Sequence, residues 1–326
     1  MFELRRSIFV LLLASCLSTC SGQGLDGPFN HWLLQSNAPE AQPLTISSEI
    51  GAIFLNRRGA AGQSIVFDQD FNEISNANQL DGGIGNGVLF KVDFLNVSRT
   101  EPIDFAFEMF SIDRISARQN LEADEVIPYF FDAIPINPTD QETVTYISDL
   151  QNYEFNLRYR GVPGIQLLAG VRYFEVDETF DVFHSFGTVN RLGFFSFNKN
   201  EFLGGQIGIA TTFWSNAASS IYGSAKYGFM RNYVGGRANA LDAFGNSVNV
   251  RFTDNNFSNL LDLELGVYGA LTKRFGFKGG YRGIFVDSFA ALPDQSAEFH
   301  LFGGPGEVAY RGGRWHGFFV SIETVW

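Results

Sequence analysis

The chain has little of what most catalytic and metal-binding proteins depend on. It holds two cysteines, Cys16 and Cys20, and both lie in a segment that we expect to be removed. The mature chain would then have no thiol for a disulfide, a metal site or nucleophilic catalysis. It also lacks any apolar run of the ~20 residues that a transmembrane helix needs. A helical membrane protein is therefore excluded.

Basic residues are in the minority, since 23 Lys and Arg face 35 Asp and Glu and the net charge is -12. Nucleic acid is disfavoured as a partner, because its binding rewards clustered Lys and Arg. Methionine is rare, with 3 residues, whereas 35 Phe, 11 Tyr and 35 Gly are present. These abundant residue types favour pleated strands and tight turns over long helices. The composition therefore predicts an all-β fold.

The N-terminus has the organisation of a bacterial export signal. Arg5 and Arg6 give it positive charge, residues 7–14 form an apolar core, and residues 15–22 are mostly small. A lipid anchor is the alternative, because the sequence Leu-Ala-Ser before Cys16 resembles a lipoprotein cleavage box, with Cys16 as the lipidated residue. We expect a signal peptide over 1–22, a periplasmic lead-in over 23–45 and a barrel over 46–326.

After the lead-in, apolar and polar residues alternate, as they do in strands with two different faces. Phe275, Phe277 and Tyr281 share one face of such a segment, while Lys278 and Arg282 share the other. Segments of ~10 residues are long enough for a tilted strand to cross a bilayer. Ten segments show the pattern, near 46–56, 86–95, 101–112, 150–160, 164–178, 200–214, 218–232, 258–272, 274–288 and 315–326.

The connections between these segments alternate in length. Outer-membrane barrels have short periplasmic turns, long outside loops and an even number of strands. The sequence therefore predicts a closed antiparallel transmembrane β-barrel of ten strands with both termini in the periplasm. Two further alternating stretches, 64–67 and 247–252, leave twelve strands as the alternative. The short connections are 96–100, 161–163, 215–217 and 273, and the long ones include 113–149, 179–199, 233–257 and 289–314.

The polar face of the strands would line the lumen, and its charges nearly balance. This balance indicates pairing between neighbouring strands, for example of Glu264 with Arg282. A ten-stranded barrel is only slightly wider than the eight-stranded kind that side chains fill, which disfavours a wide diffusion pore. The expected acids are Glu49, Asp93, Asp104, Glu108, Glu154, Asp262, Glu264 and Glu323, and the expected bases are Lys91, Arg158, Arg160, Arg172, Lys226, Lys278 and Arg282.

The last strand carries Phe318, Val320, Ile322 and Trp326 on one face, and the sequence ends on the aromatic residue. This pattern looks like the C-terminal insertion signal that the barrel-assembly machinery recognises in bacterial barrels. A terminal aromatic side chain also suits the belt at a membrane interface. We therefore expect this machinery and outer-membrane lipid as partners.

Three segments near the end of the sequence stand out, residues 280–287 (GYRGIFVD), 292–295 (LPDQ) and 315–320 (WHGFFV). They look like the C-terminal pattern of a porin-like family of outer-membrane barrels that is common in planctomycetes and legionellae. Residues 49–57 and 200–214 are similar to the first and middle strands of that family. The resemblance implies an outer-membrane location and no agreed biochemical activity, and the stretch 113–149 has no counterpart in it.

Histidines supply an enzymatic alternative, an outer-membrane hydrolase with a His/Asp or Ser/His site. His184 with Ser185, and His300, fall in expected outside loops, but one sequence does not give the geometry that defines such a site. We favour exposed loop histidines, and no cofactor or metal is expected. The acids that could orient these histidines are Asp177, Glu178, Asp181 and Asp294.

The sequence thus indicates a non-enzymatic barrel of a Gram-negative-type cell envelope. Its expected role is structural or surface-interacting, or that of a narrow porin-like channel with a charge-paired lumen. An extracellular ligand would bind through the long loops. A soluble secreted β-protein is disfavoured by the aromatic residues on the outward strand faces.

Overall fold

The computed structural model describes residues 44–58, 64–67, 73–76, 80, 83–98, 101–122, 127–128, 141–162, 164–186, 190–216, 218–241, 247–292, 295, 299–300, 304–305 and 308–326. The expected signal peptide, Cys16 and nearly all of the expected lead-in lie outside these described residues.

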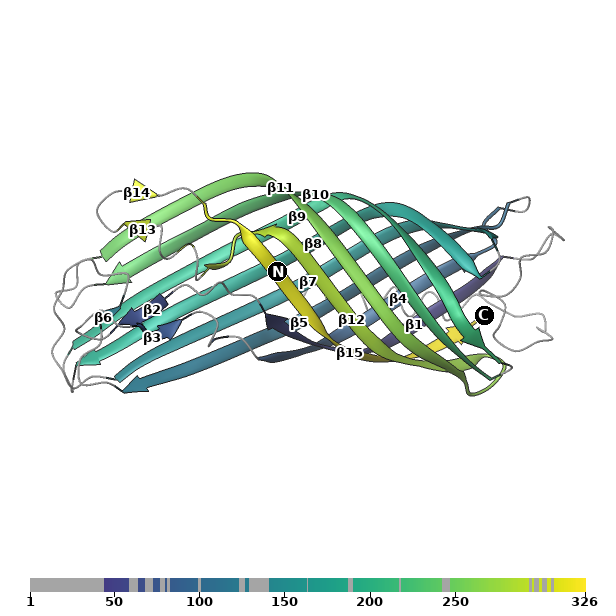
Figure 1. Ribbon diagram of the computed structural model, residues 1–326, viewed down its shortest axis with the longest axis horizontal. Helices are drawn as coiled ribbons and strands as arrows, with labels where there is room; N and C mark the ends of the chain where they lie inside the picture. The colour runs from purple at the N-terminus through teal and green to yellow at the C-terminus, as the bar shows by residue number, and fades with distance from the viewer. Residues whose placement is uncertain are drawn as a thin grey trace.

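Ten long strands form a closed antiparallel barrel, as the alternating pattern predicted (Figure 1). The barrel closes through β1, which pairs with β4 on one side and with β15 on the other. The strands are β1 (Thr45–Arg58), β4 (Ile84–Leu95), β5 (Ile103–Glu122), β7 (Gln141–Val162), β8 (Ile165–Phe186), β9 (Asn190–Ser215), β10 (Ser219–Leu241), β11 (Ser247–Ala270), β12 (Phe275–Phe289) and β15 (Arg311–Val325).

Five short strands lie outside the barrel wall, and they settle the count in favour of ten. β2 (Ser64–Phe67), β3 (Glu73–Asn76) and β6 (Ile127–Pro128) form one small sheet, and β13 (Phe299–His300) and β14 (Gly304–Pro305) form another. Both sheets lie at the end of the barrel away from the C-terminus (Figure 1). The alternative of twelve strands is therefore wrong, because 64–67 joins a separate sheet and 247–252 is the start of β11.

A belt of exposed apolar side chains surrounds the outside of the barrel. In water such a surface would be costly, whereas lipid tails solvate it. The protein is accordingly an outer-membrane β-barrel. No described helix is long and apolar enough to span a membrane. Representative belt residues are Ile50, Phe54, Phe155, Leu157, Val171, Leu203, Ile207, Phe229, Leu265, Phe277, Tyr281, Phe285, Phe318 and Val320.

The strands extend well beyond this belt at the end opposite the termini, which we assign to the cell exterior because the termini of such barrels are periplasmic. The predicted strand ends were therefore wrong, because most of the expected loops 179–199 and 233–257 belongs to strands β8, β9, β10 and β11. The reason is that the alternation inverts outside the membrane. In β7, Val144, Tyr146 and Leu150 are buried inside, while Thr143 and Thr145 face outward. We call the wall beyond the belt the outer wall.

Candidate functional site in the barrel lumen

A six-residue charge network crosses the middle of the lumen. Its acids are Glu108, Glu154 and Asp262 and its bases are Arg172, Lys226 and Arg282, and all six side chains are buried. Each acid comes from a different strand, β5, β7 or β11, and the bases come from β8, β10 and β12. The network therefore connects opposite walls of the barrel, and it occupies the space that a solute would have to pass.

Arg282 has the most contacts in this network. Its Nη1 is 2.5 Å from Glu108 Oε1, and its Nη2 lies 2.6 Å from Asp262 Oδ2 and 3.3 Å from Glu154 Oε1. Lys226 Nζ bridges Glu154 Oε2 at 2.8 Å and Glu108 Oε2 at 3.3 Å. Buried ions need such multiple partners to offset the loss of hydration.

Arg172 completes the network from the other wall. Its Nη1 lies 2.8 Å from Asp262 Oδ2, and its Nε donates to Asn152 Oδ1 at 2.6 Å. The sequence predicted pairing between neighbouring strands, but most of these contacts join strands that are not neighbours. The named pair also differs, because Glu264 lies opposite Arg282 in the register while the guanidinium turns to Asp262, Glu108 and Glu154.

The remaining expected lumen charges form smaller groups nearer the periplasmic end. Lys278 Nζ lies 2.7 Å from Glu49 Oε2 and 3.1 Å from Glu323 Oε2. Two further groups lie among β4, β5 and β7. Arg158 Nη1 lies 3.1 Å from Asp93 Oδ2, and Lys91 Nζ lies 3.9 Å from the same atom. Arg160 Nε lies 2.7 Å from Asp104 Oδ2.

An apolar layer lies directly beyond the central charges, and the sequence reasoning missed it. Phe174 packs against Phe202 and Trp315 with ring centroids 5.8 and 5.6 Å apart, and Phe289 packs against Trp315 at 5.4 Å. The two layers touch, because the Arg172 guanidinium lies 5.5 Å from the centroid of the Phe174 ring. Cation–π contacts of this kind favour a guanidinium over an aromatic face.

A segment of the chain enters the lumen next to the apolar layer. The end of β12 and the residues after it, Ser288–Leu292, turn inward, and residues 289–292 are buried. Asn200 of β9 fixes this inward segment through both of its amide atoms: Nδ2 donates to Ala290 O and Oδ1 accepts from Ala290 N, each at 3.0 Å. From the neighbouring strand β10, Asn232 Nδ2 donates to Ser288 O at 3.1 Å and to Asn200 Oδ1 at 3.0 Å.

A buried ion pair between Glu178 and Arg57 holds the inward segment at Leu292. Glu178 Oε2 accepts a hydrogen bond from the Leu292 N–H at 2.8 Å, and Glu178 Oε1 lies 2.8 Å from Arg57 Nη2. The Arg57 guanidinium also lies over the rings of Tyr146 and Phe289, at 4.6 and 5.3 Å. This cluster could have been found from the inverted alternation, which places Arg57 and Glu178 among inward apolar positions.

The residues of the enzymatic alternative do not gather in one described site. Glu178 faces the lumen, whereas Asp177 and Asp181, on the same strand, face outward. The side chains of His184, Ser185 and His300, and all of Asp294, lie outside the described part of the structure. Among the described residues, no group of three or more His, Cys, Asp or Glu could hold a metal ion.

The outer wall carries two carboxylates whose pKa values shift in opposite directions. Burial raises the pKa of Asp177 to about 6, and the neighbouring Glu175 carboxylate adds to the rise. Burial also opposes ionisation of Asp287, but hydrogen bonds from the backbone N–H and the side-chain amide of Asn259 outweigh it and lower the pKa.

These shifts predict opposite pH dependences for two neutral variants. The folded protein holds the Asp177 proton more tightly than the unfolded chain, so stability falls as the pH rises from the ordinary pKa of 3.8 to about 6. Asp177→Asn should therefore raise the thermal midpoint at pH 7 and have no effect below pH ~4. Asp287→Asn should lower the midpoint at pH 7 and lose its effect in acid. Heat-modifiable migration in gels across this pH range measures both, and equal signs at pH 7 would contradict the assignment.

The expected insertion-signal residues share the outward face of the last strand. Phe318, Val320 and Ile322 are exposed to lipid from β15, and Trp326 follows the strand. The Trp326 N–H donates to Ile46 O at 2.9 Å, which fastens the end of the chain to the first strand. Whether these residues direct insertion remains a prediction.

No family model matches the sequence, and no curated protein matches it. Solved structures of barrels do match. The outer membrane protease OmpT from Escherichia coli has 10% identity, with 89% of this chain and 100% of that chain covered and a TM-score of 0.49. The Ralstonia pickettii toluene transporter TbuX has 8% identity, with 93% and 95% covered and a TM-score of 0.35. The attachment invasion locus protein Ail of Yersinia pestis has 10% identity, with 87% and 100% covered and a TM-score of 0.24. At these values the matches indicate nothing about the activity of this chain.

Proposed function

We propose that this protein is a sealed barrel with a structural or surface-interaction role in the outer membrane, and not a diffusion channel. The observation that carries the proposal is that two different layers fill the lumen in series. The central charge network spans it from wall to wall, and the apolar layer with the inward segment follows directly. A hydrated solute would have to displace both layers.

The outer wall supports the surface-interaction part of this proposal. A channel needs only strands that cross the bilayer, at ~10 residues each, whereas β9 and β11 have 26 and 24 residues. The additional length carries an apolar interior and a polar exterior, as in a soluble domain. The strands therefore present a rigid extracellular platform, to which a ligand could bind without passing through the barrel. Membership of the porin-like family is part of this proposal and rests on the sequence motifs.

Planar-bilayer recording tests the sealed lumen. The purified wild-type protein should show no stepwise conductance at any voltage up to membrane rupture. Trp315→Ala should also stay silent, because the charge network still closes the lumen beneath the missing ring. Trp315→Ala combined with Arg282→Ala should conduct only when Asn200→Ala and Asn232→Ala also release the inward segment, because that segment still blocks the lumen in the double variant. Conductance steps in the wild type would overturn the proposal in favour of a narrow channel.

A strain that lacks the protein tests the structural role. Uptake of small hydrophilic solutes should be unchanged, because no diffusion path is lost, whereas sensitivity to detergents that breach the outer membrane should increase. Slower solute uptake with unchanged detergent sensitivity would contradict the proposal.

A further inference from the structure

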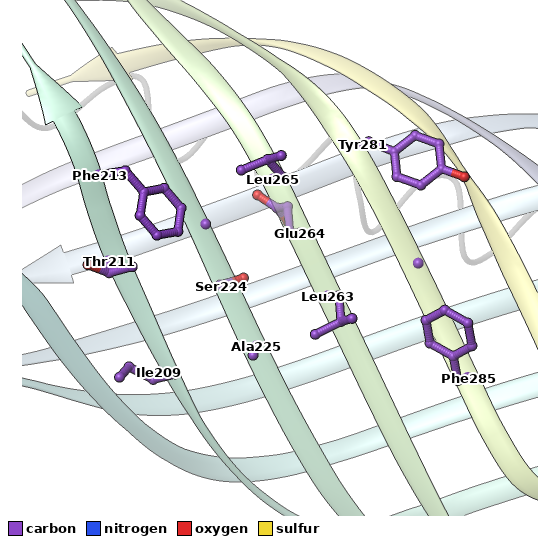
Figure 2. A pocket seen from close by; sticks show the side chains of 12 residues that line it. Ile209, Thr211, Phe213, Ser224, Ala225, Leu263, Glu264, Leu265, Tyr281 and Phe285 are labelled. Carbon is purple, nitrogen blue, oxygen red and sulfur yellow. The ribbon is translucent and has the colours of Figure 1, made fainter.

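The lipid-facing surface of the barrel is hollowed over β9 to β12. The hollow has a volume of about 420 Å3, within the range of small-molecule pockets. Its lining includes the small residues Gly223, Ala225 and Gly283. Larger side chains such as Phe213, Tyr281 and Phe285 line it as well (Figure 2). The lining is mostly apolar, so the hollow suits a hydrocarbon chain.

A pair of arginines lies beside the hollow. Arg58 of β1 and Arg314 of β15 are direct cross-strand partners, and both are exposed on the outside of the barrel. Within the described residues, neither guanidinium has a carboxylate partner. Like charges that lie directly opposite each other destabilise a strand pair, and an anion between them removes the repulsion. Guanidinium groups match phosphate oxygens in particular.

The strand register connects the arginine pair to the hollow. Arg314 is the cross-strand partner of Phe285, which lines the hollow. Two residues farther along β15, His316 is the cross-strand partner of Gly283, which also lines the hollow. The His316 Nδ1 atom lies 2.5 Å from the Tyr281 hydroxyl oxygen. Polar groups therefore lead from the arginine pair directly to an apolar hollow that faces the membrane.

We propose that this surface is a binding site for a phosphorylated lipid of the outer leaflet. Arg58 and Arg314 hold the phosphate, and one acyl chain occupies the hollow beside Phe285 and Ala225. The inference depends on the location of the barrel in the outer membrane but not on its sealed lumen. Conductance in the wild type would therefore overturn the proposed function without affecting this site.

Native mass spectrometry of the delipidated full-length protein tests the site. The protein is titrated with dimyristoyl phosphatidic acid or with dimyristoyl phosphatidylcholine, which has the same chains without net charge. Arg58→Gln combined with Arg314→Gln should weaken binding of phosphatidic acid roughly thirtyfold, since each arginine near a membrane surface contributes about 1 kcal/mol. Binding of phosphatidylcholine should change little.

Two further variants separate the phosphate contact from the hollow. Arg237 and Arg251 are a second pair of exposed cross-strand arginines, away from the hollow, and replacing both with Gln should leave phosphatidic acid binding unchanged. Ala225→Leu fills the hollow on the lipid side without adding charge, and it should weaken binding of both lipids. The matched control Val171→Leu, at another lipid-facing position, should weaken neither.

Three outcomes would overturn the proposal. The first is an equal loss of phosphatidic acid binding in both arginine double variants, which would indicate general charge attraction. The second is unchanged binding in Ala225→Leu. The third is displacement of phosphatidic acid by an equal concentration of inorganic phosphate, which would show an anion site without a lipid component.

Discussion

Replacing Arg282 with methionine should lower the free energy of unfolding by about 3–5 kcal/mol, the range for breaking a buried ion pair. Arg282 contacts all three acids of the central network, and it is 1% exposed. Methionine fills much of the same volume but leaves three buried carboxylates with two cations. Urea-induced unfolding in lipid vesicles measures the loss. Arg237→Met, at an exposed position of the outer wall, is the matched control and should change stability by less than about 0.5 kcal/mol.

A second substitution distinguishes charge balance from packing. Asp262 is the only network acid that Arg282 contacts through two nitrogen atoms, Nε and Nη2. Arg282→Met combined with Asp262→Asn restores equal numbers of acids and bases in the network. The double variant should therefore be more stable than the single variant, because the unpaired buried charge is gone. A double variant that is less stable by the sum of both losses would show that packing, not charge, governs this layer.

Trp315→Ala should have an effect of similar size for a different reason. The Trp315 side chain is fully buried between Phe174 and Phe289, so its removal leaves a cavity that the rigid barrel wall cannot close. Losses for such large-to-small changes are about 3–5 kcal/mol. The same unfolding experiment in vesicles measures it. Trp214→Ala, at a position that faces lipid, is the control and should cost much less, because lipid tails fill the space.

The tryptophan nitrogen makes a finer test of the apolar layer. Trp315 Nε1 is buried without a hydrogen-bond partner among the described residues. A buried donor without a hydrogen-bond partner lowers the free energy of unfolding. Trp315→Phe removes this donor, which offsets part of the stability lost with the smaller ring. We expect it to retain most of the stability that Trp315→Ala loses. A loss as large as that of alanine would indicate that the nitrogen has a partner, such as a buried water molecule.

The residues that face the lumen were predictable, because side chains alternate between the two faces of a strand. The inward positions of Glu154 and Arg282, for example, follow from the outward positions of Phe155 and Tyr281. Which charges meet was not predictable. The contact of Arg282 with Glu108 crosses the lumen between residues 174 positions apart, and its geometry depends on the closure and tilt of the whole barrel.

The outer wall illustrates a different limit. The stretches 179–199 and 233–257 were expected to be loops because the outward positions there are no longer apolar. Phe180 and Val182 nevertheless continue the period of two on the inside. The strands therefore continue past the membrane with inverted alternation, whereas alternation with an apolar outward face ends at the membrane boundary.

By itself, the sequence determined the class of fold, the short periplasmic turns and the face on which each membrane-spanning residue lies. It left ten or twelve strands open, and the strand pairing settled the number as ten. The properties that the sequence determined are local. Side chains alternate between the two faces of a strand with a period of two residues, and the length of a turn is read from the residues between two strands. Only the tertiary structure decided which side chains meet inside the lumen. Closure of the barrel brings Glu108, Arg282 and Trp315 from distant strands into contact, and the turn after β12 sends Ser288–Leu292 inward. Such contacts depend on the distances between walls, which no single segment encodes.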